Sequence, residues 1–286
     1  MGDGFISSVA HSETTSGFLL DVSLVFLTCQ CTPLKHKAFL DLHLSSSQWY
    51  NFPWLGGDRV QVALISYSPD AELIIAAAAR ISSSAISTRE LLTKMTPKQV
   101  SNLLKQLISA GHLSPFEHVS FTFAIGGVSR VTTHQLVRHR LASYTQQSQR
   151  YVSLKKLDYV TPFTISTHQQ IRAKYDEAVQ VAHKLYSEML DAGIPAEDAR
   201  YVLPQAIETQ LVMTMNAREL IHACSLRLCE RAQWEIRELF ERIKTEVEKV
   251  APFIGAELKP KCYDLGYCNE RESCGLFPTL KGAEVT

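Results

Sequence analysis

Hydrophobic and polar residues alternate in three stretches of the chain, and each stretch predicts a β-strand. Apolar side chains occupy both faces of residues 59–67 (RVQVALISY), which is typical of a strand buried on both sides. Residues 118–125 (HVSFTFAI) place four apolar side chains on one face, and the pair Gly126-Gly127 is expected to end this strand. A third strand is expected over residues 208–215 (ETQLVMTM).

Helical periodicity fills much of the remaining chain. Thr96 and Gln99 form a capping box ahead of one periodic stretch, and Asn216 is the expected N-cap of another. The expected helices cover residues 69–81, 97–111, 129–140, 171–192, 217–228 and 232–250. Strands and helices that follow one another without regular βαβ alternation predict the α+β class.

The chain divides into three parts by its local composition. Residues 1–58 are rich in small polar and aromatic side chains without a sustained period, so we interpret them as an N-terminal extension of uncertain order. Residues 59–258 carry the consistent strand and helix patterns and are expected to form the functional domain. Residues 259–286 form a tail that contains three of the seven cysteines.

Composition limits the classes of protein to consider. The chain has 286 residues, 45% of them hydrophobic, and 29 basic side chains balance 29 acidic ones. These values exclude a disordered protein, a collagen-like repeat and a globally basic nucleic-acid-binding protein. The longest apolar stretch, residues 17–31, contains Asp21 and is too short to span a bilayer, and we recognise no signal peptide. An odd number of cysteines in a chain of this length indicates reduced thiols in a cytoplasmic protein.

The strongest chemical signal is a segment without acids. No aspartate or glutamate lies between Glu117 and Asp158, and this interval is rich in serine, threonine, tyrosine and glutamine. Its basic side chains and histidines are Arg130, Arg138, Arg140, Arg150, Lys155, Lys156, His118, His134 and His139. Guanidinium groups combined with amide and hydroxyl donors suit phosphate oxygens and the amide edges of a ring.

The spacing of this segment narrows its interpretation. Arg130, His134 and Arg138 lie four residues apart, so we expect them to share one face of the helix over 129–140, which a polar loop follows. A solvated basic face, a nucleic-acid backbone site and a small-anion site are the alternatives. Because the cluster is short and the whole chain is neutral, a small anionic ligand is favoured.

Five motifs along the chain resemble those of one known family. The string RHRLASYTQQSQRY resembles the signature of flavin-dependent thymidylate synthases, and GHLSPFEH resembles their approach to the flavin site. The strings EDARYVLP, NARELIHACSLR and AQWEIRELF are similar to their C-terminal signatures. Together these motifs span the organised part of the chain. The resemblance implies an α+β fold in which helices flank a mixed or antiparallel sheet.

The resemblance also implies an activity. It indicates a cytoplasmic homotetramer with active sites between subunits, which binds FAD and accepts electrons from NADPH. The implied reaction transfers the methylene of 5,10-methylenetetrahydrofolate to dUMP, and reduced flavin supplies the hydride that completes dTMP. No covalent protein nucleophile and no metal ion are implied. The protein would thus orient its ligands and stabilise charge while the cofactor performs the redox step.

Site residues are carried over by matching this chain to the family motifs. For dUMP the resemblance implies Gln135, Leu136, Val137, Arg138, Gln146, Gln147, Ser148, Gln149, Arg150, Arg200 and Arg227. For FAD it implies Ser114, Arg138, His139, Arg140, Gln146, Asn216, Ala217, Arg218 and His222. His112 would lie at the entry for flavin and folate, and Arg227 would act in catalysis by stabilising negative charge on the uracil ring.

This chain departs from the family pattern at three positions. Thr145 and Gln146 stand where many members carry Asn and Glu, and His222 stands where an Asn is expected. A glutamine retains one donor and one acceptor group at the second position. These departures bear on flavin affinity and on activity, and they leave open a relative that binds nucleotide and flavin but has lost turnover.

Two further interpretations remain open. The patch from Arg138 to Arg150, with Tyr144 and Tyr151 as stacking platforms, also suits a module that binds RNA or single strands. In the tail, Cys262, Cys268 and Cys274 are either unliganded or part of a metal or redox site. Their spacing lacks the close pair of cysteines found in most structural zinc sites, which favours unliganded thiols. We expect Cys224 and Cys229 to lie on a helix and to pack against its neighbours.

Overall fold

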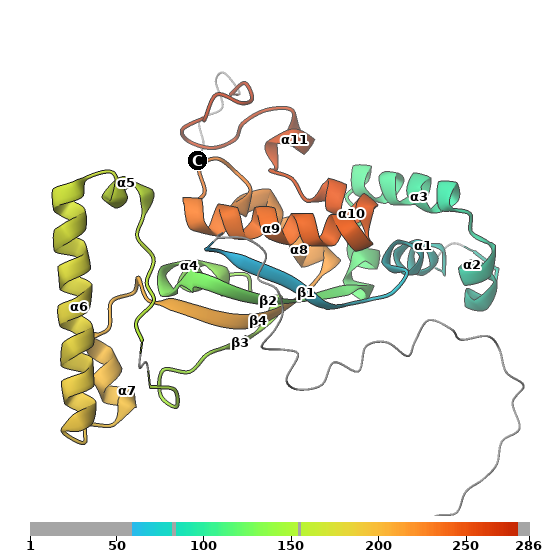
Figure 1. Ribbon diagram of the computed structural model, residues 1–286. Coiled ribbons are helices and arrows are strands. Elements are labelled where there is room, and N and C mark those ends of the chain that lie inside the picture. Colours follow the sequence, from blue (N-terminus) through green and yellow to red (C-terminus); the bar gives the residue numbers. More distant parts are fainter. Residues whose placement is uncertain (1–58, 82–83, 154–155, 280–286) are drawn as a thin grey trace, which may run out of the picture. The chain divides into compact units, whose positions relative to one another are not determined.

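A four-stranded antiparallel sheet forms the centre of the protein (Figure 1). The computed structural model describes residues 59–81, 84–153 and 156–279. The sheet has the order β1-β2-β4-β3. Its strands are β1 (Gln61–Tyr67), β2 (Ser120–Ser129), β3 (Ala142–Gln146) and β4 (Glu208–Asn216). Strands and helices together confirm the predicted α+β class with an antiparallel sheet.

One face of the sheet carries the hydrophobic core. Alternate side chains of the two central strands point to this face and are buried: Phe121, Phe123, Ile125, Leu211, Met213 and Met215. Three helices cover them (Figure 1): α8 (Ala217–Arg227), α9 (Trp234–Val250) and α10 (Pro252–Glu257). Helix α9 contributes an apolar stripe at helical spacing, namely Ile236, Leu239, Phe240, Ile243 and Val247. The sheet is therefore buried on one side only, as antiparallel sheets commonly are.

Helices close to the β1–β2 end of the sheet come from the first part of the domain. They are α1 (Ala71–Ile81), α2 (Thr88–Lys94), α3 (Pro97–Ser109) and the 3₁₀ helix η2 (Ser114–His118). The capping box predicted for α3 is confirmed: the Thr96 hydroxyl accepts from the amide of Gln99, whose side chain accepts from the amide of Thr96.

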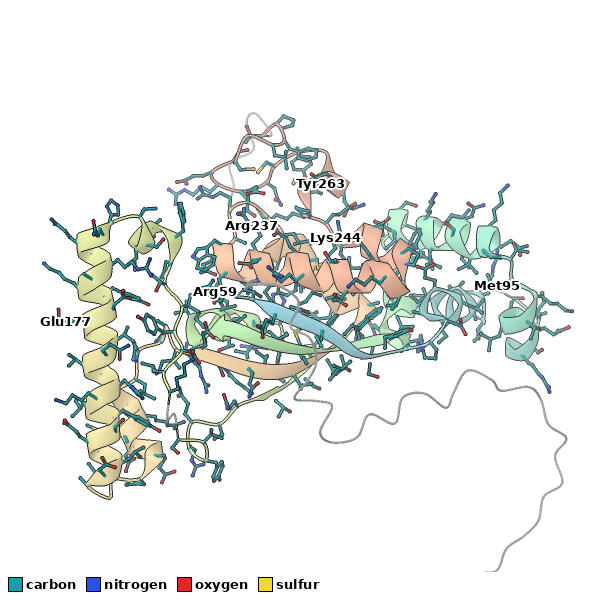
Figure 2. The ribbon with its side chains drawn as sticks, in the orientation of Figure 1. Arg59, Met95, Glu177, Arg237, Lys244 and Tyr263 are labelled. Carbon is teal, nitrogen blue, oxygen red and sulfur yellow. The ribbon has the colours of Figure 1, made fainter. Side chains whose placement is uncertain are left out.

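A second group of helices lies at the other end of the sheet (Figure 1). It comprises α5 (Phe163–Ser166), α6 (Gln169–Asp191), α7 (Ala196–Ala199) and the 3₁₀ helix η3 (Arg200–Val202). Val179 of α6 packs with Leu157 and Ile207 in a small separate cluster. The opposite side of α6 is solvated, and Glu177 projects there away from the sheet (Figure 2).

The structure corrects three local predictions. Strand β2 does not end at Gly126-Gly127 but continues to Ser129, because a bulge absorbs the glycine pair between Ile125 and Val128. The helix expected over residues 129–140 is the shorter α4 (Arg130–Leu136). The polar loop expected after that helix contains the edge strand β3, in which alternation of half-buried and exposed residues replaces a hydrophobic run.

Helix α4 ends early for a structural reason. The hydroxyl of Tyr144 in β3 donates to the carbonyl oxygens of Leu136 and His139, at 2.9 Å each. These bonds satisfy carbonyls at the C-terminus of the helix and turn the chain back into β3. Arg138 therefore lies in the turn after α4, and the expectation that it shares a helical face with Arg130 and His134 is wrong.

Over residues 259–279, the tail contains one short helix, α11 (Cys262–Leu265). Its backbone joins the domain where the amide of Lys261 donates to the carbonyl of Ser225 at 3.1 Å. Cys224 is buried as expected, whereas Cys229 lies beyond the end of α8 and is only half-buried, so the prediction that it sits on the helix is wrong. None of the helices in the described ranges is both long and apolar enough to cross a bilayer.

Candidate active site

A buried chain of hydrogen bonds links the turn after α4 to helix α8. His139 is 4% exposed, and its Nδ1 lies 3.3 Å from Oε1 of Glu219. On the other side of the ring, Nε of Arg227 donates to Nε2 of His139 at 3.0 Å. Because an arginine nitrogen can only donate, Nε2 accepts and the hydrogen of the neutral ring sits on Nδ1, facing the carboxylate.

Electrostatics keep this histidine neutral. Burial, the charge of Arg227 and the proximity of His222 lower the pKa of His139 to about 4. Burial raises the pKa of Glu219, while His222 and Arg218 oppose that shift. The contact between His139 and Glu219 is therefore a hydrogen bond that the neutral ring donates to the carboxylate and not an ion pair.

The sequence of α8 explains how two of these groups come to the same side. The side chain of Asn216 accepts from the amide of Glu219 at 2.8 Å and fixes the start of the helix, as predicted for the N-cap. Glu219 and Arg227 lie eight positions apart, which places them on one helical face. His222 lies edge-on to the ring of His139, with the ring centres 6.2 Å apart.

A second polar group surrounds Arg130 at the start of α4. Its terminal nitrogen donates to the carbonyl of Gln147 at 2.7 Å. Its Nε is buried without a hydrogen-bond partner among the described residues, and burial together with the charge of Arg200 lowers its pKa. The side-chain amide nitrogen of Gln146 donates to the hydroxyls of Thr133 and Thr209, at 3.1 and 3.3 Å. These contacts join α4, β3 and β4 below the predicted nucleotide residues.

The segment after β3 is tied to the second group of helices. Arg150 forms an ion pair with Glu197 of α7, its Nε lying 2.8 Å from the carboxylate. The amide of Arg150 also donates to the hydroxyl of Ser148 at 3.1 Å. Arg200 follows α7 directly, and its positive charge contributes to the lowered pKa of Arg130. The structure thus brings Arg150 of the string RHRLASYTQQSQRY close to Glu197 of the string EDARYVLP.

Arg138 and Arg140 extend from the turn between α4 and β3. Both are exposed, and neither side chain makes a hydrogen bond or an ion pair within the described part of the chain. Two exposed cations beside the buried His139 create an uncompensated positive edge. Guanidinium groups in this state are available to bind the oxygens of a phosphate.

Ser114 and His112 lie apart from this edge, around a separate depression of about 460 Å³ between α1, α3 and η2. An ion pair between Arg218 of α8 and Glu117 of η2 connects this depression with the start of α8. The predicted flavin residues thus occupy neighbouring elements, whereas Gln135, Leu136 and Val137 complete α4 and its C-cap.

Two residues of the hydrogen-bond framework, Glu219 and Glu235, were not recognised as site residues from the sequence, and Tyr144 was considered only as a stacking platform. Glu219 and Tyr144 hold the turn that carries Arg138 to Arg140, and Glu235 of α9 accepts from the amide and hydroxyl of Ser129, at 2.8 and 2.7 Å. Glu219 could have been found from its separation of eight residues from Arg227, which places both side chains on one face of the helix. Glu235 contacts Ser129 across 106 positions of the sequence, and no local pattern marks this contact or the bond from Tyr144 to His139.

An α+β domain with cationic, hydroxyl-rich and half-buried groups at one edge of its sheet defines a protein suited to phosphorylated small molecules. Residues 63–253 match the sequence profile of the family described as "Thymidylate synthase complementing protein". The flavin-dependent thymidylate synthase of Geobacter sulfurreducens is 45% identical over 229 residues, which cover 79% of this chain and 96% of that protein. That of Pyrococcus abyssi is 45% identical over 221 residues, covering 74% and 91%. The chain belongs to the flavin-dependent thymidylate synthase family, as its motifs predicted.

A solved structure supports the same relationship. It is described as a UMP/dUMP methylase PolB from Streptomyces cacaoi bound with 5-Br dUMP. The two chains superpose with a TM-score of 0.60 at 28% sequence identity, and the match covers 69% of this chain and 94% of that one.

Proposed function

We propose that this protein is a flavin-dependent thymidylate synthase, which methylates dUMP to dTMP with FAD, NADPH and 5,10-methylenetetrahydrofolate. The observation that carries the proposal is the half-buried Arg227 held by neutral His139, next to the unpaired cations Arg138 and Arg140. A relative with this activity in its name is 45% identical over most of the chain.

The donor set suits FAD. Arg138 and Arg140 are free within the described residues to bind a diphosphate, and Ser114 and His112 line a depression one ion pair away from α8. The first turn of α8, at Ala217 and Arg218, adds backbone amides of a helix N-terminus, which favour negative charge. When bound, FAD reduced by NADPH supplies the hydride that converts the transferred methylene into a methyl group.

The dUMP site is proposed between β3, α7 and α4. Arg130 keeps a buried Nε without a partner in the described residues, and Arg150 and Arg200 face the same region from other elements. A buried donor without a partner costs free energy, so a ligand that accepts from it is stabilised. The phosphate of dUMP would compete with Glu197 for Arg150.

Arg227 is proposed to stabilise the charge that makes carbon 5 of uracil nucleophilic. Its Nε donates a hydrogen bond to His139, which fixes the plane of the guanidinium. The two terminal nitrogens of Arg227 are then left to contact the uracil ring. A fixed cation in a half-buried position is worth more than one in water, because no solvent must reorganise as charge develops. No thiol is required as nucleophile. Cys224, the described cysteine on α8, is fully buried in the core.

Exposed apolar side chains near the cations support a site shared between copies of the chain. Leu141 is 69% exposed and Tyr201 is 85% exposed, although both lie beside the proposed nucleotide residues. Exposed apolar side chains that gather in a patch commonly mark an interface. We propose a homotetramer in which a neighbouring subunit completes each site, in a cytoplasm that keeps the thiols reduced.

The alternative of a nucleic-acid-binding module is less well supported. Tyr144 is half-buried and packs against the hydrophobic core, and its hydroxyl is committed to two backbone carbonyls, so it is less available for stacking than an exposed ring. Tyr151 is exposed, and Arg150 lies over its ring at 5.5 Å. One aromatic platform paired with one arginine is a small basis for binding a strand.

The test is tritium release from dUMP labelled at carbon 5, measured with FAD, NADPH and methylenetetrahydrofolate present. The wild-type protein is expected to release tritium and form dTMP. Arg227→Ala is expected to retain flavin but to lower turnover by at least about 100-fold, because charge on the uracil loses its partner. Arg138→Ala is expected to weaken dUMP binding as measured by calorimetry.

The matched control is Arg172→Ala, which removes an exposed arginine of α6 paired with Asp176 and should leave turnover unchanged. A wild-type protein that binds flavin yet releases no tritium would identify the inactive relative. Loss of flavin from Arg227→Ala, or unchanged dUMP affinity in Arg138→Ala, would contradict the roles given to these residues.

A further inference from the structure

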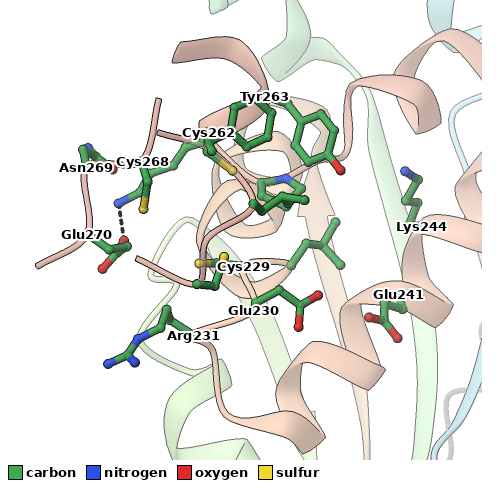
Figure 3. Close-up of a pocket in the computed structure, with 16 residues that line it drawn as sticks. Cys229, Glu230, Arg231, Glu241, Lys244, Cys262, Tyr263, Cys268, Asn269 and Glu270 are labelled. Carbon is green, nitrogen blue, oxygen red and sulfur yellow. Dashed lines mark ion pairs between the residues drawn. The ribbon is translucent and has the colours of Figure 1, made fainter. Parts of the chain in front are cut away.

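Four cysteine side chains line one cavity on the side of the domain that carries the tail (Figure 3). The cavity measures about 230 Å³ and lies between the C-terminal end of α8, helix α9 and the tail. Cys229 follows α8, Cys262 begins α11, and Cys268 and Cys274 belong to the loop after it. Three of these thiols are close in sequence, and the fold adds the fourth from more than thirty residues away.

The thiols face a common space. Figure 3 shows the side chains of Cys229, Cys262 and Cys268 around the same cavity. Burial, and the presence of the thiols of Cys229, Cys268 and Cys274 nearby, raise the pKa of Cys262. All four cysteines are free in the structure.

The described part of the tail belongs to neither of the two hydrophobic clusters of the domain. The main hydrophobic core includes no described residue beyond Leu258, and Tyr263 and Leu276 are each more than half exposed. The tail contacts the domain through ion pairs such as Arg231 with Glu272, and exposed pairs of this kind contribute little. Small segments without a core generally depend on a disulfide or a metal ion for their structure.

We propose that Cys229, Cys262, Cys268 and Cys274 bind one structural Zn²⁺ ion. Four thiolates in a closed tetrahedral shell are a common structural zinc site, and soft sulfur ligands favour zinc over magnesium or calcium. Within the described residues, no three ligating side chains already stand in the arrangement of a metal site, so the sulfurs must move closer on binding. Each thiol loses its proton as its sulfur bonds to the metal.

The position of this site gives it a structural role. Cys229 lies two residues after Arg227, so a metal ion bound there ties the end of α8 to the tail. The cavity also contains both signs of charge, from Glu230, Arg231, Glu241, Lys244, Lys261 and Glu270. With acids and bases balanced, the thiols are the feature that selects the ion. The inference does not depend on the proposed enzymatic activity.

The test is titration of the reduced, metal-free full-length protein with Co²⁺, followed by absorbance. We expect one equivalent to bind with sulfur-to-cobalt charge-transfer bands and the d–d bands of tetrahedral cobalt, and one equivalent of Zn²⁺ to abolish them. Cys262→Ser is expected to lose this stoichiometric binding. Cys224→Ala removes a cysteine buried outside the cavity and is expected to keep it.

Three results would overturn the proposal. The first is the absence of tetrahedral cobalt bands in the reduced wild-type protein, which needs no variant to fold. The second is identical binding by wild type and Cys262→Ser. The third is mass-spectrometric detection of a disulfide between these cysteines, or of bound iron and sulfide, in protein purified under reducing conditions. Flavin content is recorded in parallel and does not enter the readout.

Discussion

At the scale of single residues, the site depends on a histidine that stays neutral. Arg227 needs an acceptor for its Nε–H, and a protonated His139 would repel it instead. Burial makes the charged ring costly, and Glu219 accepts from the remaining ring nitrogen. Because the His139 ring is neutral, it can accept from Arg227 and hold this cation in a fixed orientation while it donates to Glu219.

This arrangement predicts a pH dependence of stability. The pKa of His139 is lowered to about 4 from 6.5, so the unfolded chain takes up a proton on this ring in a pH range where the folded protein does not. The contribution to stability is complete above about pH 6.5 and is lost as the pH falls toward 4, by up to about 3 kcal/mol. Urea unfolding at a series of pH values measures the effect.

His139→Gln is the comparison for that experiment, because glutamine keeps a donor and an acceptor but does not titrate. The free energy of unfolding of the variant should depend less steeply on pH between 6.5 and 4 than that of the wild type. The raised pKa of Glu219 acts with the opposite sign and is present in both proteins. Parallel pH profiles would show that the pKa of His139 is the same in the folded and unfolded states and would contradict this account.

At the scale of elements, the connection from β2 through α4 to β3 carries the cations to the edge of the sheet. Glu235 of α9 accepts two hydrogen bonds from Ser129 and thereby anchors the start of α4 to the core helix. Just before it, Gly127 has a positive φ of +65° in the bulge of β2. A Cβ atom at this position would lie 1.8 Å from the backbone oxygen of Arg59.

Gly127→Ala is therefore expected to destabilise the protein by about 3 kcal/mol or more, because a positive φ and a backbone clash act together. Gly193→Ala is the matched control, since this glycine has a φ of +82° and a Cβ atom added there would have nothing within 4 Å. It should cost only about 1 kcal/mol. Thermal or urea unfolding of both variants measures the difference, and equal destabilisation would exclude close packing as the cause.

The sequence was sufficient to predict the elements that have strong periodic patterns. The capping box at Thr96, the N-cap at Asn216 and the acid-free segment are all properties of neighbouring residues. Strand β3 was missed because an edge strand with polar residues shows no hydrophobic run. The glycine pair was misread because a bulge and a turn need the same backbone freedom.

The candidate site was predictable to a lesser degree. Motifs brought Arg138, Arg150 and Arg227 forward, but the framework that orients them is made by contacts across the fold. The bond from Tyr144 to the carbonyl of His139 ends α4, and it depends on the return of β3. The fourth thiol of the tail cavity, Cys229, was likewise invisible to a search based on local spacing.

At the scale of the whole molecule, a sheet covered on one face supports cations at one edge and a cysteine-lined tail on its helical side (Figure 1). We propose that a single copy is not the complete functional unit, because apolar side chains such as Leu141 and Tyr201 are exposed near the cations. Binding of flavin and dUMP between copies would order both the cationic edge and these side chains. The account thus predicts that ligand binding and assembly are coupled.

The most direct test is the visible absorbance spectrum of the purified protein, recorded with and without dUMP and NADPH. The account predicts a yellow protein whose flavin absorbance bleaches under NADPH, faster when dUMP is present, because the nucleotide occupies the site beside the cofactor. A colourless monomeric protein, whose spectrum and assembly do not respond to added FAD or dUMP, would contradict it.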